Sequence, residues 1–244
     1  MIRNVVTIAL SGLACVACTS LDSVELRTNG MKPDMVVRSS AEQANSKLDV
    51  QIHVGDSLVD FVDLVDPDVL TVQVDGAAAV ELTENNLLGA TGYSTDIATK
   101  APGTEIKVIL TRGPDDDGAP SSTVTLTEQL ALTAPAAGAA LSRADDDIVV
   151  TWTSEASDDD VSVSLSGDCI QPANRAVAAD ATTVTFEKGS VLKREDPEEG
   201  DPIPDSCDAT VRVVRTRTGA LDPAFGGGGI RHEFSAQAGV TTNP

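Results

Sequence analysis

The chain has 244 residues, of which 38 are acidic and 17 basic, and its net charge is -21 at pH 7. Such a negative surface repels phosphate backbones and anionic lipid head groups, which argues against nucleic-acid binding and against membrane attachment through basic patches. Hydrophobic residues make up 41% of the sequence and aromatic residues only 2%. The core must therefore consist mainly of Val, Leu, Ile and Ala, and we expect no sugar-binding platform of exposed Trp or Tyr.

The first residues have the build of an export signal. Arg3 gives a positive start, and residues 5–17 form an uncharged apolar run. That run is shorter than the roughly 20 residues that a membrane-spanning helix needs, so residues 1–17 are predicted to be a cleavable signal peptide. Val16-Ala17-Cys18, followed by the polar stretch 19–22, resembles the lipobox of bacterial lipoproteins, in which the cysteine thiol is acylated and becomes the mature N-terminus.

The resemblance implies an envelope lipoprotein that acyl chains, palmitate among them, hold in a membrane. It assigns lipidation to Cys18 and makes residues 18–23 the lipidated N-terminus and a short tether. Thr19 follows the cysteine where Asp is absent, which is compatible with sorting to an outer membrane. Cys15 is the alternative lipid site, and an ordinary signal peptide cut after Ala17 is the second alternative. We prefer Cys18 because the change from apolar to polar residues occurs there.

Beyond the signal, apolar residues recur with a period of two, which is typical of strands with one buried face. Turn-forming pairs such as Asp75-Gly76 separate these runs, and no long amphipathic helix is indicated. Short strands between such turns predict antiparallel sandwiches. The expected strands lie near residues 24–27, 48–54, 70–74, 93–97, 106–110, 123–126, 148–152, 161–165, 182–186, 210–215 and 232–236.

A stretch of small residues and proline at 133–138 predicts a boundary between two strand-rich halves. Residues 133–165 have a proline start, a strand bearing Trp152 and an acidic turn, and they resemble the opening strands of immunoglobulin-like and fibronectin type III domains. The first half is similar in layout to uncharacterised bacterial lipoproteins with tandem sandwich modules. We therefore predict an all-β chain with two tandem β-sandwich domains, at residues 24–133 and 134–244.

Cys169 and Cys207 are the only cysteines of the exported body. Export places them where disulfides persist, so a bridge is predicted that pins the acidic, proline-containing loop before Cys207 to the sandwich. The alternative is a pair of thiols that await a metal or a redox partner, but no neighbouring cysteine or histidine supports it.

The sequence Gly55-Asp56-Ser57-Leu58 resembles the GDSL esterases, in which the serine after a strand is the nucleophile. The likeness ends there, because the chain has no Gly-x-Asn-Asp block and no late Asp-x-x-His to supply a base. The esterase fold also needs parallel strands that alternate with helices, which this sequence does not predict. Ser57 is thus the residue of the least favoured hypothesis, and we expect no enzymatic activity.

Three aspartate runs, at 115–117, 145–147 and 158–160, raise the question of calcium, which takes several oxygen ligands. Their spacing does not match an EF-hand, and solvated turns are the favoured interpretation. The candidate ligands of a calcium-dependent adhesion module are Asp145, Asp147, Asp158 and Asp160. His53 and His232 are too few for an all-histidine zinc site, so no cofactor is expected. Residues 226–229 are interpreted as a flexible hairpin tip.

These observations lead to one functional expectation. The protein is expected to be a lipid-anchored protein of the bacterial envelope with a structural or binding role. Its expected partners are the membrane, through N-terminal acyl chains, and an envelope component that the sequence does not identify.

Overall fold

The structure is a computed structural model that describes residues 19–57, 59–87, 90–114, 116–155, 157–195 and 200–244. The predicted signal peptide and both candidate lipid sites, Cys15 and Cys18, lie outside the described residues. Within these ranges, no helix is long and apolar enough to cross a membrane.

Strands and turns account for almost all of the described chain. Two single-turn 3-10 helices, η1 (Ser23–Glu25) and η2 (Thr28–Gly30), precede the second strand. The strands are β1 (Thr19–Asp22), β2 (Met31–Ser40), β3 (Ser46–Val54), β4 (Asp60–Asp63), β5 (Val69–Val74), β6 (Val80–Glu81), β7 (Thr83–Leu87), β8 (Ala90–Ile97), β9 (Glu105–Thr111), β10 (Ala119–Thr125), β11 (Leu130–Ala134), β12 (Ala140–Ser142), β13 (Ile148–Ser154), β14 (Asp160–Gly167), β15 (Ala173–Val177), β16 (Thr183–Phe186), β17 (Cys207–Thr218) and β18 (Gly229–Asn243).

The strands form one large sheet and two small ones. The large sheet follows the order β1-β4-β3-β2-β18-β17-β14-β15; in addition, β8 pairs with β3 and β7, and β12 pairs with β18. The small sheets have the orders β10-β9-β5-β6 and β11-β13-β16. Most neighbours are antiparallel, but β18 pairs in parallel with β2 and β12, and β1 pairs in parallel with β4. The predicted all-β class is confirmed.

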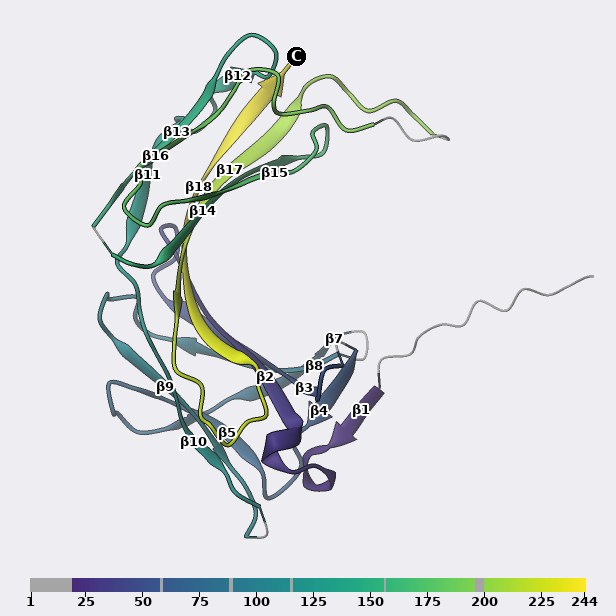
Figure 1. The fold of residues 1–244 in the computed structure, drawn as a ribbon, viewed down its shortest axis with the longest axis vertical. Helices are drawn as coiled ribbons and strands as arrows, with labels where there is room; N and C mark the ends of the chain where they lie inside the picture. The colour runs from purple at the N-terminus through teal and green to yellow at the C-terminus, as the bar shows by residue number, and fades with distance from the viewer. Residues whose placement is uncertain (1–18, 58, 88–89, 115, 156, 196–199) are drawn as a thin grey trace, which may run out of the picture.

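Figure 1 shows a C-shaped molecule in which the large sheet lines the inner side and the small sheets cover the outer side. Between the layers lie two hydrophobic cores. The first contains Leu48, Ile52 and Ile106, and we call its sandwich the first lobe. The second contains Trp152 and Phe186, and we call its sandwich the second lobe. The predicted pair of β-sandwiches is thus confirmed, although both lobes share one continuous sheet.

The C-terminal segment returns to the first lobe, which the predicted division of the chain at 133–134 does not include. Phe225 and Ile230 are buried members of the first core, with Leu221 and Ala224 packed against it. β17 and β18 have 12 and 15 residues, so they are long enough to leave the second lobe and reach the first. The sequence pattern predicts two consecutive units, whereas the first core is completed from the far end of the chain.

The second lobe has the strand order of an immunoglobulin-like domain. Strands β11, β13 and β16 form one layer and β18, β17, β14 and β15 form the other, as in Greek-key sandwiches. Trp152 points into the core from β13 and is 2% exposed. The disulfide differs from the usual bridge between the two layers, because Cys169 follows β14 and Cys207 begins β17, two neighbouring strands of one sheet.

The predicted strand at 24–27 is wrong. Residues 23–25 form η1, and Val24 is exposed, so its apolar side chain does not belong to a buried strand face. The predicted tether also ends earlier than expected, because residues 19–22 already pair with residues 60–63 as β1 and β4. The first strand of the described residues therefore begins at Thr19.

The glycine-rich loop before β18 is packed rather than open. A Cβ on Gly226 would lie 1.9 Å from the carbonyl oxygen of Asn29, and a Cβ on Gly228 would lie 2.2 Å from that of Pro33. Gly228 also has a φ of +103°, which side-chain-bearing residues rarely adopt. The interpretation of residues 226–229 as a flexible tip is replaced by a close contact of this loop with η2 and the start of β2.

Candidate functional site

Ser57, the serine of the esterase-like motif, lies in a turn. Its hydroxyl donates to Asp60 Oδ2 at 2.8 Å and accepts the backbone N–H groups of Val59 and Asp60. In the hydrogen bonds among described residues, no imidazole reaches this hydroxyl. The serine therefore closes a turn between β3 and β4, and a nucleophile without a positioned base is a poor catalyst.

His232 is buried inside the sandwich. Thr127 donates its N–H to Nδ1 at 2.9 Å, so Nε2 carries the proton and donates to Ser39 Oγ at 2.8 Å. Ser39 in turn donates to Ser46, whose hydroxyl donates to the carbonyl of Thr99, each at 2.6 Å. Burial lowers the pKa of His232 to about 4, with a further lowering from the charge of Arg217. The imidazole is thus neutral, and through Ser39 and Ser46 it links β18 to β2 and β3.

The candidate calcium ligands do not form one site. Asp145 and Asp147 precede β13, whereas Asp158 and Asp160 follow it. Asp147 accepts the N–H of Lys188 at 2.9 Å. Across the described ranges, no group of three or more His, Cys, Asp or Glu residues is arranged to hold a metal ion.

Asp159, the middle residue of its run, has a different role from a solvated turn. It is buried and takes two hydrogen bonds from the Arg217 guanidinium, at 2.8 and 2.9 Å. That carboxylate, with the surrounding acidic groups, raises the pKa of Arg217 against the opposing effect of burial. The pair connects β17 to the turn before β14.

The predicted bridge between Cys169 and Cys207 is confirmed, with Cα atoms 5.7 Å apart. Cys169 is fully buried, and Cys207 is partly buried at the edge of the second core. Thr242 on β18 lies beside both sulfurs, at 3.4 and 3.7 Å. The bridge closes the segment that carries the acidic loop.

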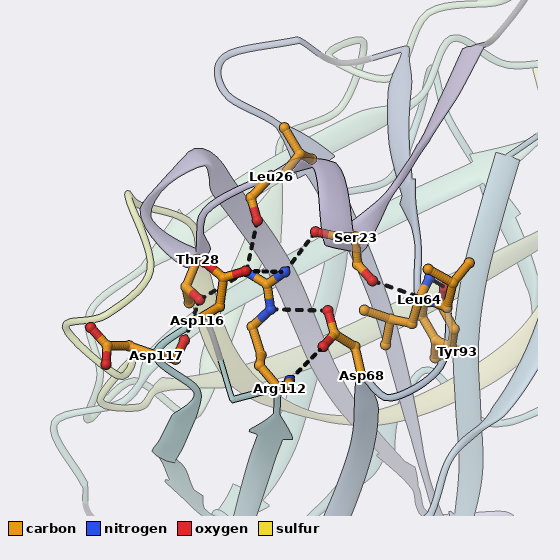
Figure 2. A network of polar contacts seen from close by, with 11 residues as sticks. Ser23, Leu26, Thr28, Leu64, Asp68, Tyr93, Arg112, Asp116 and Asp117 are labelled. Carbon is orange, nitrogen blue, oxygen red and sulfur yellow. Dashed lines mark hydrogen bonds and ion pairs between the residues drawn. The ribbon is translucent and has the colours of Figure 1, made fainter.

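Arg112 is the centre of a buried polar cluster that holds the segment after β1 (Figure 2). Its side chain is 0% exposed and donates to Asp68 Oδ2 at 2.9 Å. The same guanidinium donates to the carbonyls of Ser23 at 2.6 Å and Leu26 at 2.8 Å, and to Thr28 Oγ1 at 3.2 Å. Both charges are thus desolvated and matched, which makes the cluster a structural clamp on the N-terminal segment.

Tyr93 adds a second attachment next to this cluster. Its buried hydroxyl accepts the N–H of Leu64 at 2.6 Å and donates to the carbonyl of Val62 at 3.2 Å. Burial raises the pKa of the phenol to about 12. The end of β4, which pairs with β1, is thereby fixed to β8.

Polar side chains also lie between the two cores, in what we call the waist: Arg215, Arg217, Asp159 and His232. Arg215 is fully buried on the core side of β17. Its guanidinium donates to Ser154 Oγ, to the carbonyl of Glu155 at 2.9 Å and to that of Glu128 at 3.4 Å. Burial lowers its pKa. This layer explains why one continuous sheet carries two separate cores.

The inner side of the large sheet, which we call the concave face, is open and mostly polar. Along β14, β17, β18, β2 and β3, buried side chains alternate with outward ones. The outward positions are polar apart from Val36, Val214 and the glycines. They include Ser162, Ser164, Ser166, Thr210, Arg212, Thr216, Arg231, Glu233, Ser235, Gln237, Thr241, Asp34, Arg38, Lys47, Asp49 and Gln51.

In the first lobe, the charges of this face neutralise one another. Arg231 pairs with Asp34 and with Glu233, the latter at 2.8 Å. Arg38 pairs with Asp49 at 2.8 Å and lies 3.6 Å from Glu233. These side chains form a ladder of ion pairs across β18, β2 and β3. The ladder holds the three strands in register.

Three hollows follow one another along the concave face. The first, of about 250 Å³, lies over β2, β3 and β8 and includes Asp34 and Gln51. The second, of about 280 Å³, lies over the waist and includes Arg38, Arg212 and Gln237. The third, of about 700 Å³, lies in the second lobe beside Ser166, Thr210 and Thr241. The concave face is therefore the candidate binding surface.

The sequence alone does not predict this surface. The outward residues of one face belong to strands that are far apart in the sequence, and their proximity depends on the parallel pairing of β18 with β2. The alternation of Ser162, Ser164 and Ser166 with valines and a leucine was a usable signal for one outward row, but it does not indicate a ligand.

The comparisons with known proteins add little to this description. No family model and no curated protein sequence matches the chain. Among solved structures, the chain is similar to the FN1-FN3 domains of chicken CNTN1, at 10% identity and a TM-score of 0.25 over 87% of this chain and 66% of that one. A two-domain fibronectin type III segment of chicken tenascin matches at 16% identity and 0.21, over 76% of this chain and 90% of the segment.

A third similar structure is the SGBP-B protein of a Bacteroides ovatus mixed-linkage glucan utilization locus, in complex with a mixed-linkage heptasaccharide. It has 10% identity and a TM-score of 0.23, over 88% of this chain and 60% of that one. The chain thus spans less than two thirds of the CNTN1 and SGBP-B structures. The overlap in space is slight at these scores, so the architecture stands on the strand pairing and the two cores of this chain.

Proposed function

We propose that the protein is a non-enzymatic binding protein of the bacterial envelope, held at a membrane by acyl chains on Cys18, and that the concave face receives its ligand. The observation that carries the binding role is the open polar face with its three hollows. The opposite faces of the same strands are buried under the two small sheets, so this is the side of the large sheet that a ligand can reach.

The start of the fold supports a close attachment to the membrane. β1 begins at Thr19, and the Arg112 cluster fixes residues 23–28 a few positions later. An acyl chain on Cys18 would therefore hold the first lobe next to the bilayer rather than at the end of a flexible linker. The net charge of -21 opposes adsorption to anionic lipids, so the acyl chains must supply the attachment.

Palmitate labelling and mass spectrometry of the mature N-terminus test the anchor. The proposal predicts an acylated Cys18 as the first residue and loss of the label in Cys18→Ser but not in Cys15→Ser. An N-terminus that carries no acyl group would contradict the anchor.

Steric blocking tests the binding surface. Unacylated Cys18→Ser protein is added to native envelope fragments, and its sedimentation with them is measured. A cysteine at Gln237 on the concave face is coupled to a bulky maleimide, and the matched control carries it at Val149, an exposed residue of the outer sheet. Loss of sedimentation with the Gln237 adduct alone is expected, whereas equal retention of both adducts would contradict the proposed face.

A further inference from the structure

The middle hollow contains an arginine whose surroundings differ from those of the other cations on the concave face. Arg212 lies at the centre of β17, with Ser164 on β14 and Gln237 on β18 as its neighbours in register. Its side chain is partly buried and lines the hollow of about 280 Å³ over the waist.

Arg212 differs from the other cations of the concave face in having no carboxylate as an ion-pair partner. Arg231 and Arg38 are each paired with acidic residues of the same face, and Lys47 is paired with Asp49 at 2.9 Å. In the part of the chain that the structure describes, the Arg212 guanidinium has no ion pair and no hydrogen bond. The N–H groups of this guanidinium are therefore available to an external acceptor.

The other charged groups of the hollow already have partners. Arg38 is paired with Asp49 at 2.8 Å, and the lining contains one anion, Glu42. The Glu42 carboxylate already accepts the N–H of Gln237 at 3.4 Å, on a stretch of β18 beyond its pairing with β2. A carboxylate thus fits beside this strand. Ser40, Gln43 and Ser235 complete the lining with neutral hydrogen-bonding groups.

We infer that Arg212 binds a carboxylate of an acidic peptide that lies along the concave face. The inference rests on the proposed function, which makes this face the ligand surface. A planar guanidinium offers two parallel N–H groups to a carboxylate, a geometry that an ammonium group does not reproduce. Serine and threonine side chains on both sides of Arg212 can bond peptide groups without adding charge.

The burial of every aromatic residue favours a peptide over an acidic sugar as the ligand. All six of them are buried, at 6% exposure or less: Phe61, Tyr93, Trp152, Phe186, Phe225 and Phe234. The face therefore offers no ring on which a sugar could stack.

Calorimetric titration tests the inference with a blocked five-residue peptide that has one central Glu between serines, and with its Gln twin. We expect the Glu peptide to bind about tenfold more tightly or better, as a charge-assisted bidentate pair requires. Arg212→Gln should erase the difference and Arg212→Lys should retain part of it. Arg27→Gln, at an exposed arginine outside the face, is the matched control and should leave the difference unchanged.

Equal or undetectable binding of the two peptides, or the same discrimination in Arg212→Gln, would overturn the inference. Binding of an oligogalacturonate in place of the Glu peptide would overturn its peptide part. The proposed function fails on a different result, namely unchanged envelope binding after the concave face is blocked at Gln237.

Discussion

Ile230 and Phe234 lie on the same side of β18, four residues apart, yet they pack in different hydrophobic cores. His232 lies between them and is buried with its hydrogen bonds to Thr127 and Ser39 satisfied. One strand, β18, therefore crosses from the first lobe to the second through a polar layer (Figure 1). The two lobes are joined by strand pairing rather than by a flexible linker, so the concave face is a single continuous surface.

The buried imidazole predicts a specific loss of stability in acid. The folded pKa of His232 is about 4 and its ordinary value is 6.5, so below pH 6.5 the unfolded chain binds a proton that the folded chain does not. Stability is complete above pH 6.5 and falls as the pH decreases toward 4. Between pH 7 and pH 5 this residue alone should lower the free energy of unfolding by about 2 kcal/mol.

Urea unfolding at both pH values, in the wild type and in His232→Gln, measures this contribution. The variant should be less stable at pH 7 but should lose about 2 kcal/mol less between the two pH values. Parallel losses in the two proteins would show that other groups govern the acid response.

The Arg112 cluster predicts that the N-terminal segment depends on one side chain. Arg112→Met leaves the buried Asp68 carboxylate without its cation, which should cost about 3 to 5 kcal/mol of folding stability. Hydrogen exchange should increase first at residues 19–28, because the carbonyls of Ser23 and Leu26 lose their donor. The double variant Arg112→Met, Asp68→Leu removes both charges and should be less damaged; equal damage would contradict the role of the ion pair.

The disulfide predicts a large stabilisation of the second lobe. Closing a segment with a sequence separation of 38 residues restricts the unfolded chain, and in the chain-entropy account this is worth about 4 kcal/mol. Thermal unfolding with and without a reductant should show the loss, and the Cys169→Ala, Cys207→Ala double variant should resemble the reduced protein. An unchanged melting temperature after complete reduction would contradict this prediction.

The packed glycine loop gives a prediction with an internal control. Gly226→Ala places a methyl group against the Asn29 carbonyl oxygen and should destabilise the protein by about 1 to 3 kcal/mol. Gly229→Ala meets no atom within 4 Å and should change stability by less than about 0.5 kcal/mol. Chemical denaturation of both variants is the measurement, and similar values for the two would contradict the close contact between this loop and η2.

The sequence predicts the strands of this protein better than their assembly. Period-two alternation locates β3, β9, β13 and β14, because each buries one face. It misassigns residues 24–27, where the apolar residues have no sheet to join. It also misses the return of Phe225 and Ile230 to the first core, since that contact depends on the lengths of β17 and β18.

The candidate site illustrates the same limit. The disulfide is predictable because only two cysteines are available in the exported body. Arg212 is not, because its sequence neighbours resemble those of Arg215 on the same strand. The Arg212 side chain points outward into a hollow, whereas the Arg215 side chain is fully buried between the cores. The register of β17 with β14 and β18 sets this difference.

Photo-cross-linking in living cells tests the central claim most directly, which is that the concave face receives the ligand. A photoreactive amino acid replaces Gln237 on that face or Val149 on the outer sheet, in protein that retains Cys18. The account predicts a discrete cross-linked product from position 237 and none from position 149. Products from both positions in equal yield, or from position 149 alone, would contradict it.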